Sequence, residues 1–140
     1  MNVYAESSAV LAWLLEEAQA ARMQEILGSA ELVAASNLMM VECDRAFMRA
    51  EVLGQLSTLE ARRRRTLLET ASARWNLLGV EGTLERARQR FPEEPVRALD
   101  SIHLASALAA RLVLPDLIFL SLDQRVRDNA SALGFALLPE

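Results

Sequence analysis

Short apolar runs alternate with longer stretches of helical periodicity along the 140 residues. Apolar runs bounded by turn residues predict buried strands, and strands that alternate with helices are typical of a parallel sheet with right-handed helical crossovers. Strands are expected at about residues 2–6, 32–35, 77–80, 117–120 and 135–138. The pattern therefore predicts an α/β fold with a short, mostly parallel sheet of four or five strands.

Helices are predicted between these strands from their capping residues. Ser7 or Ser8 can cap a helix over residues 9–15, and Ser36 or Asn37 can cap one that runs to about Ala50. Ser57 stands three residues before Glu60, which is a capping box for a long helix that ends near Trp75. The remaining helices are expected over residues 18–27 (ending near Gly28), 83–90, 96–112 and 123–133 (closed by Gly134). About seven helices follow.

Composition narrows the class of protein. Hydrophobic residues make up 52% and charged residues 24%, which is typical of a globular chain, and the length suits a single domain over residues 1–140. Cys43 is the only cysteine, so no internal disulfide can form, and inert packing in a cytoplasmic protein is expected. No run approaches the roughly 18–20 apolar residues of a membrane helix, and the N-terminal residues lack the basic start of a signal peptide.

The charge distribution bears on nucleic-acid binding. The net charge of −4 argues against a nonspecific basic coat but allows a nuclease with a local basic rim. All basic residues are arginine. The run at residues 62–65 is interpreted as a solvated face that pairs with Glu60 and Glu69, with phosphate contact as the alternative. Arg45 and Arg49 share a predicted helix with Glu42, which makes them the better candidates for RNA contact.

Four carboxylates stand at or near predicted strand ends. Each has a structural explanation: a helix-dipole contact for Glu6, a pair with Arg45 for Glu42, a first-turn position for Asp100 and a helix cap for Asp123. Asp100 is the hardest to explain in this way, because its helix is apolar on nearly every side and an unpaired carboxylate there is costly. Open parallel sheets form sites at the carboxyl ends of their strands, and clustered carboxylates repel one another without a cation. Together they predict a Mg²⁺ or Mn²⁺ site.

At these residues the sequence resembles the PIN-domain family, in particular the VapC-type toxins. Four segments carry the resemblance in the family's order, and residues 97–107 (RALDSIHLASA) are the most specific of them. The other three are residues 4–9 (YAESSA), residues 36–38 with Glu42, and residues 120–125 (LSLDQR).

The resemblance implies a PIN-like three-layer α/β/α fold and a metal-dependent endoribonuclease that acts as the toxin of a toxin–antitoxin pair. Position by position, Glu6, Glu42, Asp100 and Asp123 would be the acidic catalytic residues, with Glu6, Asp100 and Asp123 on the metal. Ser7 and Ser121 would supply the supporting hydroxyl groups. The expected partners are an RNA substrate, a second copy of the chain in a homodimer and a small antitoxin protein.

Three points stay open at the level of sequence. The family's first acid is normally Asp, so Glu6 raises the alternative of a weakened or inactive PIN-like module that binds RNA or protein, and a third possibility is an unrelated α/β domain with scattered acids. His103 is interpreted as a hydrogen-bonded core histidine, with a general base as the alternative. Trp13 is expected in the core, with a dimer interface as the alternative.

Overall fold

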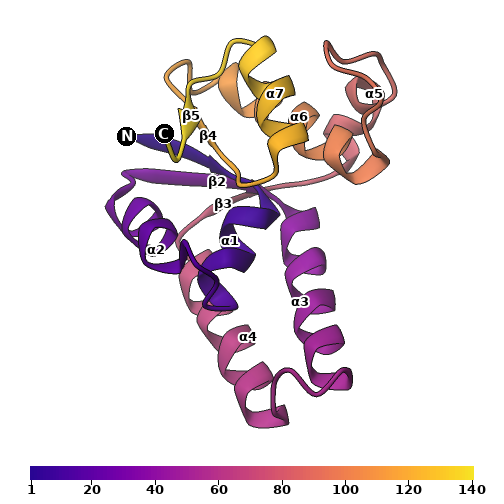
Figure 1. The fold of residues 1–140 in the computed structure, drawn as a ribbon. Helices are drawn as coiled ribbons and strands as arrows, with labels where there is room; N and C mark the ends of the chain where they lie inside the picture. Colours follow the sequence, from indigo (N-terminus) through magenta and orange to yellow (C-terminus); the bar gives the residue numbers. More distant parts are fainter.

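The computed structural model describes residues 1–140, and its centre is a five-stranded parallel sheet with the strand order β3-β2-β1-β4-β5 (Figure 1). The strands are β1 (Asn2–Ala5), β2 (Leu32–Ser36), β3 (Asn76–Leu78), β4 (Ile118–Leu120) and β5 (Leu137–Leu138). All five predicted strands are present, and the prediction of a short, mostly parallel sheet is confirmed.

Seven α-helices surround the sheet. They are α1 (Ser7–Leu14), α2 (Ala20–Ser29), α3 (Asn37–Val52), α4 (Thr58–Ser72), α5 (Leu84–Ala87), α6 (Ala98–Arg111) and α7 (Gln124–Ala132). The helix expected over residues 83–90 is wrong in extent, because the segment forms a 3₁₀ turn (Glu81–Thr83) followed only by the short α5. Gly134 follows α7 with φ +88°, as the predicted helix end requires, whereas Gly28 lies inside α2 rather than ending it.

The alternation of side chains along the strands divides the core into two layers. Val3 and Ala5 face a cluster that includes residues of α1, α2, α3 and α4, whereas Tyr4 between them faces a cluster with α6 and α7. Successive strand residues point to opposite faces, so one buried strand serves both layers. The predicted three-layer α/β/α architecture is confirmed, and Figure 1 shows α1 to α4 on one side of the sheet and α5 to α7 on the other.

Strand order sets the position of the candidate site. The chain builds outward from β1 to β2 and β3 and then returns to place β4 on the other side of β1. This reversal between β1 and β4 is a topological switch point, where the loops that leave neighbouring strands diverge and open a crevice at the carboxyl ends. Glu6 follows β1 directly, and Asp123 lies three residues after β4.

Caps explain where the site helices begin. Ser36 caps α3 by accepting from the Leu38 amide, and the predicted capping box of Ser57 and Glu60 is present on α4. The prediction for α1 is wrong: Glu6, not Ser7 or Ser8, is the N-cap, and its side chain accepts from the Ser8 amide. The polypeptide turns immediately at the end of β1, so Ser7 is already helical and its hydroxyl is free for other contacts.

Packing also answers two smaller predictions. Cys43 is fully buried with its thiol 3.7 Å from the Met39 sulfur, and burial raises its pKa, as inert packing implies. Trp13 is half-buried against the α1–α4 side of the core.

None of the helices combines the length and apolar character needed to cross a bilayer.

Candidate active site

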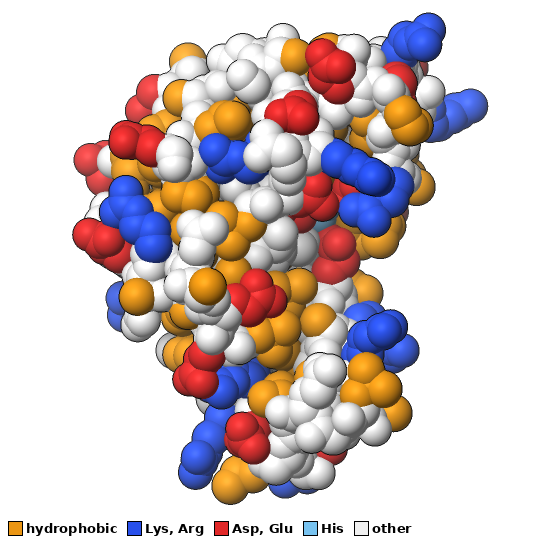
Figure 2. All heavy atoms as spheres, in the orientation of Figure 1, with side chains coloured by type: hydrophobic (Ala, Val, Ile, Leu, Met, Phe, Trp, Pro, Cys, Tyr) orange, Lys and Arg blue, Asp and Glu red, His pale blue; other side chains and the backbone are white.

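The four acidic residues singled out in the sequence come from four different segments that meet around the carboxyl ends of β1 and β4. Glu6 lies at the β1–α1 junction and Asp123 at the start of α7, while Glu42 projects from α3 and Asp100 from the first turn of α6. Figure 2 shows acidic side chains gathered in the hollow between the N-terminal part of α3 and the α6–α7 side, with basic side chains beside them. Hydrogen bonds and ion pairs link these segments in two groups.

Glu6 is the most deeply buried of the four, with 4% of its surface exposed. Its Oε2 atom accepts from the Ser8 amide at 3.2 Å, from the Ser8 hydroxyl and from the Ser121 hydroxyl at 2.8 Å. Its Oε1 atom makes no hydrogen bond within the protein. Burial raises the pKa of Glu6 despite the nearby His103 and these hydroxyl donors, because the ionised form is poorly solvated. One oxygen of Glu6 is therefore fixed and the other is free to bind a cation or a proton.

Ser121 connects Glu6 to the segment that carries Asp123. The Ser121 hydroxyl is fully buried, donates to Glu6, and accepts from the Asp123 amide at 3.1 Å. Asp123 Oδ1 in turn accepts from the first amides of α7, at 3.0 Å from Arg125 and 3.4 Å from Val126. The cap predicted for Asp123 is thus present, and it uses Oδ1 while leaving Oδ2 on the side of Asp100.

Glu42 belongs to a second, buried network with Ser7, His103 and Tyr4. Its Oε1 atom accepts from the Ser7 hydroxyl at 2.7 Å and lies 2.5 Å from His103 Nε2, while the other ring nitrogen lies 3.2 Å from the Tyr4 hydroxyl. Partial burial raises the pKa of the Glu42 carboxyl, but the bonds from His103 and Ser7 outweigh it and the net pKa is lowered. The suggested pair with Arg45 is wrong: Arg45 contacts the Met48 sulfur at 3.5 Å instead.

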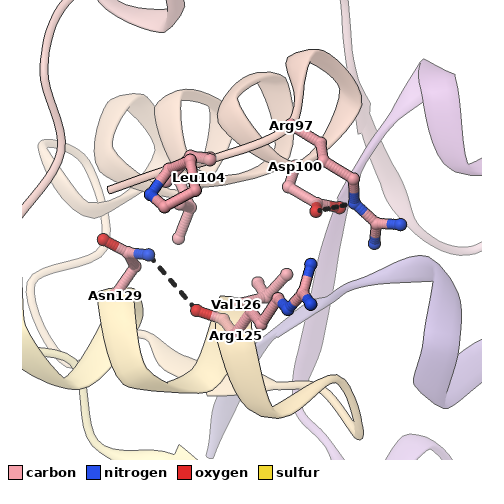
Figure 3. A pocket seen from close by; sticks show the side chains of 8 residues that line it. Arg97, Asp100, Leu104, Arg125, Val126 and Asn129 are labelled. Carbon is pink, nitrogen blue, oxygen red and sulfur yellow. Dashed lines mark hydrogen bonds and ion pairs between the residues drawn. The ribbon is translucent and has the colours of Figure 1, made fainter. Parts of the chain in front are cut away.

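Asp100 and Asp123 share one cation, the guanidinium of Arg97. Arg97 Nε lies 3.0 Å from Asp100 Oδ2, and an Nη atom lies 3.4 Å from Asp123 Oδ2. Figure 3 shows Arg97 beside Asp100 at the edge of a small pocket, with Arg125 reaching toward them from α7. The hydrogen bond and charge of Asp100, with the charge of Asp123, raise the pKa of Arg97 further. The side chain of Arg97 is 67% exposed, so this pair lies largely in water.

The remaining arginines divide into paired and unpaired groups. Arg45 and Arg49 are exposed on α3, the helix of Glu42, as predicted, and neither makes an ion pair. In the run at residues 62–65, Arg64 pairs with Glu16 and Arg65 pairs with Asp44 and Glu69. The predicted pairing with Glu69 is present, whereas the one with Glu60 is wrong, because the Glu60 side chain accepts from the Ser57 amide in the capping box instead.

Sequence reasoning missed two features of the site. Arg97 lies three residues before Asp100 at the N-cap of α6, and an i,i+3 pair was readable from that spacing. The contacts of Tyr4 with His103 and of Ser8 with Ser121 join residues that are about 100 positions apart in the chain. No pattern of neighbouring residues predicts such contacts. His103 is fully buried and hydrogen-bonded, which confirms the core interpretation, but its contact with Glu42 was not foreseen.

The donor set suits a hard divalent cation in chemistry. Glu6 has an oxygen without a partner, and Asp100 and Asp123 already share a positive charge. No three Asp, Glu, His or Cys side chains are arranged as a preformed metal site. In this structure the guanidinium of Arg97 provides the positive charge shared by Asp100 and Asp123.

Fold and site together define an α/β protein with an acidic crevice at the switch point of a parallel sheet. The family model described as "PIN domain" matches residues 3–132, and the chain belongs to that family. It is similar to Ribonuclease VapC35 of two Mycobacterium tuberculosis strains, CDC 1551 / Oshkosh and ATCC 25618 / H37Rv, at 30% identity over 66 residues. That match covers 47% of this chain and 49% of the relative, so the chain spans about half the length of the curated relatives it matches.

A solved structure has the same fold. The crystal structure of PAE2754 from Pyrobaculum aerophilum superimposes with a TM-score of 0.62 at 17% sequence identity, over 97% of this chain and 81% of that one. At this identity the likeness concerns the fold alone.

Proposed function

We propose that this protein is a divalent-metal-dependent endoribonuclease and the toxin of a toxin–antitoxin pair in the cytoplasm. The proposal is supported by the placement of Glu6, Glu42, Asp100 and Asp123 on four segments around the switch point of a PIN-family sheet. The similarity to Ribonuclease VapC35 over about half of the chain supports RNA as the substrate. A small antitoxin protein and a homodimer belong to the same proposal.

Each acidic residue has a distinct part. Glu6, Asp100 and Asp123 would hold Mg²⁺ or Mn²⁺, which supplies positive charge against the phosphoryl group and makes water more acidic. Ser121 holds Oε2 of Glu6, so that only Oε1 is presented, and Ser7 holds Oε1 of Glu42 in the same way. Glu42, whose pKa is lowered, stays ionised near neutral pH and would orient the attacking water through Oε2.

The substrate would be a single-stranded or looped RNA, because a narrow acidic crevice needs an accessible strand. Exposed Arg45 and Arg49 on α3 would contact its phosphates beside the acids. Arg97 would release the aspartates when the cation binds, and its charge would then be available to the substrate.

The test is cleavage of a structured RNA pool with Mg²⁺, with Mn²⁺ and with chelator. Metal-dependent cleavage is expected from the wild type, and Asp100→Asn should lose at least about 100-fold, because the cation that would offset the transition-state charge loses a ligand. Cleavage that survives Asp100→Asn in a folded protein would refute the proposal.

A second candidate is a PIN-like module that binds without cutting. Two observations favour it: Glu6 stands where the family has Asp, and Arg97 occupies the space between two of the acids. In the same assay Glu6→Asp separates the two. Cleavage by Glu6→Asp but not by the wild type would identify a nuclease that Glu6 inactivates. If neither the wild type nor Glu6→Asp cleaves a broad RNA pool, a binding role is favoured.

A further inference from the structure

The single histidine of the chain, His103, joins three of the segments that build the site. It lies on α6 one turn after Asp100, and its ring contacts Tyr4 of β1, Ser7 at the start of α1 and Glu42 of α3. None of its surface is exposed. A side chain in this place cannot touch an RNA phosphate, so a role in the reaction has to pass through another residue.

We infer that His103 is a positioning residue, whose protonated Nε2 fixes Oε1 of Glu42 and thereby presents Oε2 of Glu42 to the crevice. The inference rests on the proposed function for its consequence in catalysis. The hydrogen bond itself does not depend on that function.

The proton on Nε2 follows from the donors and acceptors around it. An ionised carboxylate only accepts, so the contact of 2.5 Å between Nε2 and Glu42 Oε1 requires the proton on Nε2. Ser7 donates its own proton to the same oxygen at 2.7 Å, so it cannot also donate to Nε2, 3.0 Å away. Burial raises the pKa of Tyr4, so its phenol stays protonated and can donate to Nδ1, 3.2 Å away, when the ring proton is on Nε2.

Two donors on one oxygen restrict how the Glu42 carboxylate can turn. Oε1 is held from two elements, α1 and α6, while Oε2 makes no hydrogen bond within the protein. Glu42 is one-quarter exposed, whereas both donors are buried, so the free oxygen is the part that reaches solvent. The arrangement matches the general pattern in which an outer partner orients a ligand or base and its loss costs about 10–100-fold in activity or affinity.

The same network of hydrogen bonds argues against His103 as a general base. Both ring nitrogens already have partners inside the protein, Glu42 on one side and Tyr4 on the other. A base must have a nitrogen within reach of the proton it removes. His103 therefore orients Glu42 without receiving a proton from the substrate.

The first test is the nitrogen NMR spectrum of the imidazole at pH 7 in tag-free, histidine-labelled protein, where a lone histidine needs no assignment. A protonated Nε2, whose signal changes in Glu42→Gln, is the expected result. A neutral ring with its proton on Nδ1 and a bare Nε2 would overturn the inference. This readout requires no RNA and no metal, so it decides the hydrogen bond even if the protein cuts nothing.

The second test is a double-mutant cycle on RNA cleavage. His103→Leu should lower kcat about tenfold with little change in KM, and His103→Gln, which keeps a terminal N–H, should recover part of the loss. In a Glu42→Gln background the His103→Leu change should cost little more. Equal, additive losses in both backgrounds would contradict the inference.

A matched control removes the effect of stability alone. Leu68 is fully buried on α4 and belongs to the core rather than to the site, so Leu68→Ala should lower stability without a loss that depends on Glu42. If Leu68→Ala showed the same coupling to Glu42 as His103→Leu, the histidine would be structural only. Wild-type protein that does not cut RNA would refute the proposed function instead, and the NMR result would still stand.

Discussion

The inner and outer halves of the acidic site are held in different ways. In the inner half, Glu6 and Glu42 each have one oxygen fixed by buried hydroxyl, amide or imidazole donors. In the outer half, Asp100 and Asp123 share the exposed guanidinium of Arg97. Buried donors fix geometry, and removing one leaves an unpaired group, whereas an exposed ion pair is weak and exchangeable. The inner half is thus held rigidly, and under the proposed function the outer half is where a divalent cation would replace the guanidinium of Arg97.

The largest effects that test this difference between the two halves are expected when the two inner glutamates are neutralised in turn. Glu6 is buried with a raised pKa, so its charge costs stability at neutral pH, and Glu6→Gln should raise the free energy of unfolding. Glu42 has a lowered pKa, so Glu42→Gln should reduce stability by about 1 kcal/mol. Thermal unfolding at pH 7 measures both, and shifts of the same sign would contradict the account.

The pH dependence sharpens the same contrast. The pKa of Glu6 is raised in the folded state, so its contribution to stability is complete below the unfolded pKa of about 4.3 and is lost as the pH rises through the folded pKa. The gain in stability from Glu6→Gln should therefore grow toward neutral pH. A lowered pKa gives stability above about pH 4.3 that is lost as the pH falls through the folded value, so the cost of Glu42→Gln should shrink in acid. Denaturant titrations from pH 3.5 to 7.5 on both variants measure these trends.

The outer half is tested by Arg97→Gln. Loss of an exposed pair should cost little stability, while the freed aspartates should bind Mn²⁺ up to about fivefold more tightly. Calorimetric titration of Mn²⁺ into RNA-free protein measures the gain. Arg125→Gln, on the other side of the same pocket but without an ion pair to either aspartate, is the matched control. Weaker Mn²⁺ binding by Arg97→Gln would show that Arg97 supports the cation rather than competing with it.

The smallest effect is expected outside the acids. If Arg49 contacts an RNA phosphate, Arg49→Ala should lower the slope of log affinity against log salt by about one. Arg62→Ala, an exposed arginine on α4, should leave the slope unchanged. Binding is measured with Asp100→Asn protein in chelator, so that cleavage cannot interfere. Equal slopes for both variants would show that Arg49 does not contact an RNA phosphate.

The fold was largely predictable because it depends on local patterns. Each strand is an apolar run between turn residues, and the caps at Ser57 and Asp123 are readable from a few neighbouring letters. The α5 region was less accurate: its residues are good helix formers, yet the helix ends at Ala87 rather than at Arg90. Even the error at α1 had a local cause: Glu6 is an unusual N-cap, and serines normally take that position.

The site was predictable as a set of acids but not as a set of contacts. Four carboxylates near strand ends pointed to one crevice, since parallel strands end at one edge. Which donors hold each oxygen depends on tertiary packing, as between Ser121 and Glu6, 115 positions apart. For the same reason the pairing of Glu42 with His103, rather than with Arg45 on its own helix, could not be read from spacing.

Mn²⁺ binding in the absence of RNA is the most direct test of the central claim that these carboxylates form a cation site. We expect the wild type to bind Mn²⁺ in calorimetry, and we expect the Asp100→Asn/Asp123→Asn double variant to lose that binding while keeping its fold. Unchanged Mn²⁺ affinity in the double variant, or no binding by either wild type or Arg97→Gln, would contradict the account.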